Sequence, residues 1–176
     1  MIKVHPALPP LPFRPEAIHW LLEWGVTIAV RDPSSARGGG YWWPEQKKVD
    51  LFTAQEEAAI HELAHAWWHS RRLQDANAAR LIAAVVKLSE ERDPRYARAA
   101  ELASHYVYGI PTQRDPNSPT GWWRGLLVEG NDWEMFAGLA SGTMGDVSLL
   151  PPYVRPFYEG LFDEKPTGRL PTQAHP

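Results

Sequence analysis

Apolar and polar positions along the first fifty or so residues predict a short helix followed by a small sheet. Pro15 is typical of a first helical position and Gly25 of a helix stop, so we expect a helix over residues 15–24. A glycine-rich loop is expected at 32–40. Three short apolar runs predict the strands, which cover residues 26–30, 41–43 and 48–52.

A longer apolar stretch follows the third strand and predicts a helix that begins near Thr53. Thr53 and Glu56 have the spacing of a capping box, which marks a helix start. Apolar residues then recur as far as Trp67, and the run contains neither Pro nor Gly. The H-E-x-x-H sequence at residues 61–65 therefore lies about two turns into a helix.

The second half of the chain predicts mostly helices. An apolar stripe predicts one helix over 75–92, and Pro94 opens another that closes at Gly109. Residues 110–121 are rich in Pro, Asn and Ser and predict a loop before a helix that carries Glu134.

This order of elements predicts a mainly helical α+β domain. A short mixed or antiparallel sheet is expected to pack on the H-E-x-x-H helix, and a last short helix is expected over 154–162. Residues 1–14 are predicted to form an extended Pro-rich arm, 15–162 the domain itself, and 163–176 a flexible tail.

Composition argues against several function classes. The chain has 176 residues, which suits one domain with its own core. A net charge of −3 and the lack of a basic stripe argue against nucleic-acid binding. No apolar run resembles a transmembrane helix or a signal peptide, so we expect a cytoplasmic protein without a membrane partner. Because the chain has no Cys, it forms no disulfides and offers no thiolate to a zinc ion.

The H-E-x-x-H sequence carries the clearest chemistry. Residues four apart share one face of a helix, so His61 and His65 can both point at one metal ion. Glu62 projects nearby and can take a proton from an activated water molecule. This combination is the signature of zinc peptidases.

Catalytic zinc sites usually have three protein ligands, so a third ligand must come from elsewhere. The metzincin pattern would require Gly at position 68 and His at position 71, but Trp68 and Arg71 stand there. His69 lies about 80° from His61 around a straight helix, which makes it a poor third ligand. We expect His69 at the surface or beside a ligand.

A second segment, Glu-Met-Phe-Ala at 134–137, resembles the Glu-aromatic-aromatic-Ala run of lethal-factor-like gluzincins, which are zincin-type zinc metallopeptidases. The resemblance is confined to this run, the H-E-x-x-H sequence and their strand-plus-helix context. It implies Zn²⁺ as cofactor, with His61, His65 and Glu134 as its ligands and Glu62 as general base.

The chain also departs from related patterns. Thermolysin-type enzymes have an Asp four residues after the ligand Glu, where this chain has Gly138. Asp132 therefore stays open as an alternative ligand, or as an acceptor for a histidine N–H. In such families the edge strand of the sheet pairs with an extended substrate, and residues 48–52 or 41–43 are the expected edge.

Together these features predict a zinc-dependent peptide-bond hydrolase that acts on a peptide or protein substrate. A further group should stabilise the oxyanion formed during hydrolysis. Two other functions stay open: a catalytically silent zincin that serves as a metal-binding regulatory or interaction module, and a toxin- or phage-associated protease with one narrow protein target. The candidate oxyanion donors are Tyr153, Tyr158, Tyr106 and His105.

Overall fold

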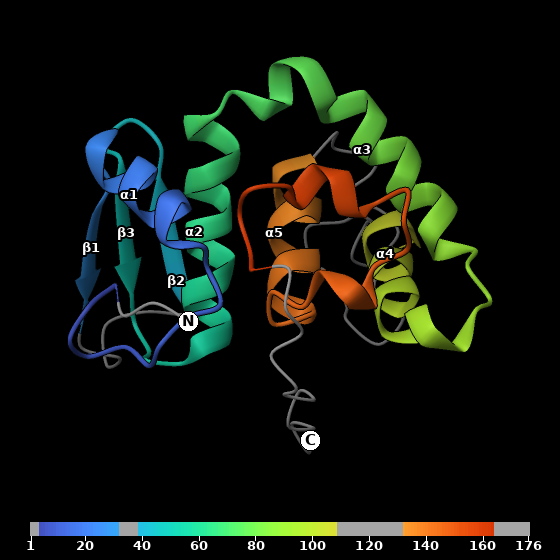
Figure 1. The fold of residues 1–176 in the computed structure, drawn as a ribbon, viewed down its shortest axis with the longest axis horizontal. Coiled ribbons are helices and arrows are strands. Elements are labelled where there is room, and N and C mark those ends of the chain that lie inside the picture. Colours follow the sequence, from blue (N-terminus) through green and yellow to red (C-terminus); the bar gives the residue numbers. More distant parts are fainter. Residues whose placement is uncertain (1–3, 32–38, 109–131, 164–176) are drawn as a thin grey trace, which may run out of the picture.

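The protein, described here from a computed structural model, is a mainly helical α+β protein with one small sheet (Figure 1). The structure describes residues 4–31, 39–108 and 132–163. Three predicted segments lie wholly or mostly outside these residues: the loop at 110–121, the loop at 32–40 and the tail at 163–176. In chain order the helices and strands are α1 (Pro15–Glu23), β1 (Thr27–Val30), β2 (Gly40–Trp43), β3 (Lys48–Leu51), α2 (Glu56–Ser70), α3 (Leu73–Ser89), α4 (Ala97–Tyr108) and α5 (Asp132–Gly142).

The sheet is mixed, with the strand order β1-β3-β2. β1 pairs with β3 in parallel, whereas β2 pairs with it antiparallel, so that Trp42 lies opposite Val49. Val49 and Leu51 are fully buried, and β2 and β3 both contact α2. Because β3 is central, the expectation that residues 48–52 form an edge is wrong, while residues 41–43 do lie in an edge strand.

α2 begins later than the sequence predicts. Gln55 is its N-cap residue and makes no side-chain cap, while the hydroxyl of Thr53 accepts a hydrogen bond from the N–H of Gln55 at 3.2 Å. The expected capping box is therefore absent, because Thr53 stabilises the turn before the helix. Glu56 and Glu57 still place negative charge in the first turn, where the helix dipole favours it.

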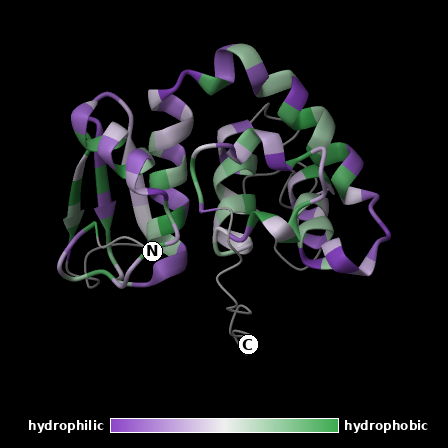
Figure 2. Ribbon diagram, in the orientation of Figure 1, coloured by the Kyte–Doolittle hydropathy of each residue, from purple (hydrophilic) through white to green (hydrophobic). Residues whose placement is uncertain are grey.

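α5 lies at the centre of the helical part and contacts α2, α3 and α4 (Figure 1). Its Phe136 stacks on Trp68 of α2 and on Tyr158, with ring centroids 4.6 Å and 4.4 Å apart. On α3, polar and apolar residues alternate along the helix (Figure 2), which is typical of a helix with one face on the core. The predicted stripe on α3 is buried and consists of Leu81, Val85 and Leu88.

Both ends of the described chain pack on this core. Leu8, Leu11 and Phe13 are buried, and Phe13 forms an isolated β-bridge with Phe162. Residues 4–14 thus contribute to the core, although we expected them to form an extended arm.

The expectation of a short helix over 154–162 is wrong in its extent. The structure has a single 3₁₀ turn, Arg155–Tyr158, because the chain leaves helical geometry at Glu159 and Gly160 has a φ of +81°. Within the described residues, no helix has the length and apolar character needed to span a membrane.

Candidate metal centre

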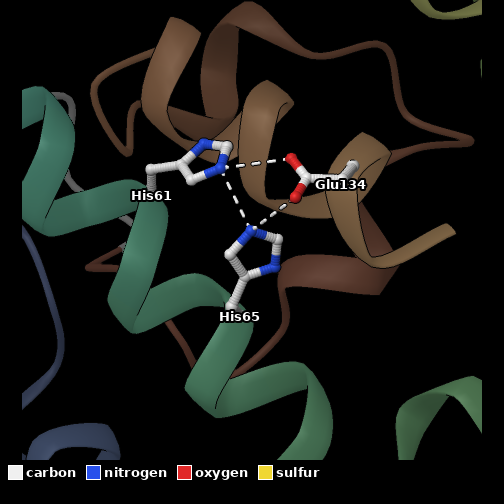
Figure 3. Close-up of side chains that lie close together, drawn as sticks. All are labelled: His61, His65 and Glu134. Carbon is white, nitrogen blue, oxygen red and sulfur yellow. Dashed lines mark hydrogen bonds and ion pairs between the residues drawn. The ribbon is translucent and has the colours of Figure 1, made fainter. Parts of the chain in front are cut away.

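The two histidines of the H-E-x-x-H sequence meet Glu134 where α2 packs on α5 (Figure 3). His61 and His65 lie one turn apart on α2, and their Nε2 atoms are 3.0 Å apart. Glu134 lies in the first turn of α5. Its Oε2 atom is 3.3 Å from Nε2 of His61, and its Oε1 atom is 3.3 Å from Nε2 of His65. Three potential metal ligands from distant parts of the sequence therefore converge on one point.

These three side chains fit a zinc ion. Zinc binds imidazole nitrogen and carboxylate oxygen at about 2.0–2.2 Å, so two ligands of one ion lie roughly 3–4 Å apart. The observed separations of 3.0 and 3.3 Å fall within that span. Two nitrogen ligands and one oxygen ligand also match the donor set that catalytic zinc prefers.

The centre is closed on one side and accessible on the other. The side chain of His65 is 3% exposed, whereas those of His61 and Glu134 are 26% and 30% exposed. Trp133, 37% exposed, packs its ring 5.2 Å from that of His65. The centre is therefore accessible on the side of His61 and Glu134.

The charges of the cluster are strongly coupled. Burial acts to raise the pKa of Glu134, but hydrogen bonds from His61 and His65 outweigh it and hold that pKa far below its usual range. Burial acts to lower the pKa of His61, but the neighbouring carboxylates, above all Glu134, raise it on balance. A carboxylate that stays ionised between two imidazoles favours a bound cation.

Glu62 lies next to this cluster, between α2 and the edge strand β2. Its side chain is buried, and the backbone N–H of Trp42 donates a hydrogen bond to its carboxylate. Burial is the main reason that its pKa rises to about 7; His61 opposes the rise and the charge of Glu134 adds to it. A pKa near neutrality suits a group that both accepts and donates a proton.

Gly40 makes room for this carboxylate. A Cβ atom at Gly40 would lie 2.7 Å from Cγ of Glu62 and 3.0 Å from a methyl group of Leu51. Even an alanine at position 40 would push the Glu62 side chain away from β2. Gly40 therefore helps to position Glu62. The sequence alone does not indicate this role, because it depends on how β2 packs against α2.

Ser141 is a functional candidate that the sequence did not indicate. Its hydroxyl donates to the carbonyl of Gly138 at 3.3 Å and lies 3.4 Å from Nδ1 of His61. A hydroxyl that donates to the Gly138 carbonyl is able to accept a hydrogen bond from Nδ1–H of His61. With its proton on Nδ1, His61 would offer the Nε2 lone pair to a metal ion in place of the present contact between Nε2 and Glu134.

Replacing Ser141 with alanine is expected to weaken zinc binding about tenfold, because His61 loses the partner that fixes its ring and tautomer. The affinity can be measured by competition with a zinc-chelating indicator. Ser104→Ala on α4 is a matched control and should bind zinc as the wild type does. Equal affinity for zinc in Ser141→Ala and the wild type would contradict this role.

Two predicted neighbours of the site have other partners. Asp132, the alternative ligand, is buried and accepts a hydrogen bond from the Trp68 indole at 2.7 Å. His69 accepts one from the Trp42 indole at its Nδ1, 3.0 Å away. Among the described residues, the group that can hold a metal contains neither of them.

The candidate oxyanion donors are widely separated. The Tyr153 hydroxyl donates to Glu91 at 3.2 Å, and the Tyr158 hydroxyl donates to the Phe136 carbonyl at 2.8 Å within the core. His105 lies on α4 and does not belong to the metal-binding group of the described residues.

Tyr106 of α4 lies over α5, one turn beyond Glu134. A Cβ atom built on Gly138 would lie 1.4 Å from its hydroxyl oxygen, so the phenol occupies the space that a side chain at position 138 would need. Burial, reinforced by the negative charge of Glu134, raises the pKa of Tyr106 and keeps its hydroxyl protonated. Gly138, where thermolysin-type enzymes have an Asp, thus admits a hydrogen-bond donor close to the cluster.

Comparisons with models of protein families, with curated proteins and with solved structures find no match to this chain. Its functional interpretation therefore depends on the geometry of the site and on the resemblance carried by the H-E-x-x-H sequence and residues 134–137.

Proposed function

We propose that this protein is a zinc-dependent hydrolase of peptide bonds. The observation that supports this proposal best is the convergence of His61, His65 and Glu134, with Glu62 buried beside them. A purely structural zinc site is usually closed by four protein ligands, whereas three ligands leave a position for substrate or water. An open side and a neighbouring base favour catalysis over a structural role.

The residues divide the chemistry among them. A zinc ion, when bound, would lower the pKa of a water molecule and polarise the carbonyl of the scissile bond. The Glu62 carboxylate would accept the proton of the attacking water and later deliver it to the leaving amine. Its pKa of about 7 suits both transfers.

The edge strand β2 supports a peptide as the substrate. It lies at one side of the sheet, and it contacts α2 next to Glu62. An extended chain that adds to such an edge is held by backbone hydrogen bonds, which are independent of its side chains. The substrate peptide would then pass directly beside the general base.

We assign the stabilisation of the oxyanion to Tyr106. Tyr106→Phe removes the hydroxyl but keeps the ring that fills the space over Gly138. We expect a decrease of about 10²-fold in kcat with little change in KM, because the donor acts on charge that develops in the transition state. The same change at Tyr153, whose hydroxyl bonds to Glu91, should leave kcat unaltered and serves as the control.

The proposed function is tested with purified protein and a mixed peptide library. We expect one zinc ion per chain by elemental analysis, cleavage of peptide bonds, loss of cleavage after treatment with a chelator, and recovery with added zinc. Stoichiometric zinc without any cleavage would favour a catalytically silent zincin. A protein that binds no zinc would contradict the proposal altogether.

A further inference from the structure

A large cavity lies away from the metal centre, between the end of α2, α3 and the 3₁₀ turn Arg155–Tyr158. Its volume is about 920 Å³, at the upper end of the range for ligand sites in proteins. Trp67 lines it from α2, where it points about 160° away from His65, and Arg71 lines it from the C-cap of that helix. The cavity and the metal centre are therefore on different faces of α2.

The cavity is positively charged in a protein whose net charge is −3. Arg71, Arg80 and Lys87 line it, and among the described residues Glu159 provides the one carboxylate of its lining. Within the described residues no ion pair neutralises any of the three cations. Such a concentration of uncompensated charge favours an anionic ligand.

Aromatic rings hold the three cations in place. The Arg71 guanidinium lies 5.2 Å from the ring centroid of Trp67, and Lys87 lies 4.1 Å from that of Tyr153. Arg80 lies 5.9 Å from the ring of Phe157. Contacts with ring faces position a cation without removing its charge, so these groups remain able to pair with a ligand.

The spacing of the cations indicates the shape of the ligand. Arg80 and Lys87 are seven residues apart on α3, which places them on one face and about 10.5 Å apart along the axis. Ala83 and Ala84 lie between them and leave the space open. A peptide in the polyproline II conformation has three residues per turn and rises about 3.1 Å per residue, so side chains three positions apart lie on one side and span roughly the same distance.

We propose that this cavity binds an acidic peptide segment in the extended polyproline II conformation, with carboxylates spaced about three residues apart. A single small anion would reach one of the two α3 cations, whereas a peptide reaches both and can also place apolar side chains against Trp67, Tyr153 and Phe157. The cavity would thus hold part of a protein partner away from the metal centre.

The experiment measures fluorescence anisotropy of a labelled peptide with Glu at every third position, bound to the full chain carrying Glu62→Gln. This background prevents cleavage, so the result does not depend on the proposed peptidase activity. We expect Arg80→Gln combined with Lys87→Gln to weaken binding at least about tenfold, and binding to weaken further with added salt. The control, Arg72→Gln with Arg98→Gln, removes equal charge outside the cavity and should change binding less than about twofold.

Three results would overturn the proposal. One is equal weakening by the two double variants, which would indicate general electrostatic attraction. Another is equal binding of the peptide in which every Glu is Gln. The third is tight binding of inorganic tripolyphosphate through Arg80 and Lys87 while the acidic peptide does not bind, because this would identify a phosphate site instead.

Discussion

Replacing Glu62 with glutamine should lower the rate of peptide hydrolysis at least about 10³-fold while zinc stays bound. Glutamine has nearly the same shape and can still accept the hydrogen bond from the Trp42 N–H, but it cannot take up a proton. General acid–base catalysis typically contributes 10² to 10⁴ in rate, and here one group would serve two proton transfers. Zinc content is measured by elemental analysis and the rate with a peptide that the wild type cleaves.

Stability provides the control for this variant. The pKa of Glu62 is raised from 4.5 to about 7 in the folded protein, so its protonation stabilises the fold at low pH and this contribution is lost as the pH rises through 7. A neutral glutamine carries no buried charge at any pH. Metal-free Glu62→Gln should therefore melt no lower than the wild type at pH 8, and full peptidase activity in a folded variant would refute the role of Glu62 as the base.

Local patterns predicted the parts of the site that lie close together in the sequence. The spacing of His61 and His65 fixes their relation through helix geometry alone, so the H-E-x-x-H sequence was enough to bring them together. Glu134 lies 69 residues beyond His65, and its place came from a resemblance rather than from periodicity. The structure brings all three together.

The sequence did not predict the roles of residues that act through tertiary packing. Ser141 reaches His61 because α2 and α5 pack against each other, and a serine on a helix carries no signal of such a contact. The role of Gly40 likewise appears once β2 is placed beside Glu62. Tyr106 was one of four oxyanion candidates, and the packing of its phenol over Gly138 distinguishes it from the others.

Helices and strands were predicted well where periodicity is strong, and less well at their ends. The stripe on α3 and the order of helices and strands agree with the structure. The start of α2 was misplaced because Thr53 could satisfy either a cap or a turn, and the burial of Leu8 and Leu11 was missed because prolines around them suggested an extended arm. A local hydrogen bond decided the first case, and packing on the core decided the second.

The third ligand is decided by a pair of variants on α5. Glu134→Ala should weaken zinc binding by more than about 100-fold, because loss of a ligand exceeds the 10- to 100-fold effect typical of a residue that only positions one. Asp132→Asn should change the affinity less than about threefold, because Asp132 bonds to Trp68 and belongs to no metal-binding group of the described residues. Both affinities follow from competition with a zinc-chelating indicator.

The asparagine is chosen because its carbonyl oxygen can still accept the Trp68 N–H. Asp132→Ala would leave that buried indole unpaired and cost about 1–3 kcal/mol of stability, which would confuse loss of zinc with loss of fold. If Asp132→Asn lost zinc as completely as Glu134→Ala while melting like the wild type, Asp132 would be the ligand and Glu134 the neighbouring acceptor. Retention of zinc by Asp132→Asn and its loss from Glu134→Ala, with both proteins folded, would identify the centre as one built from His61, His65 and Glu134.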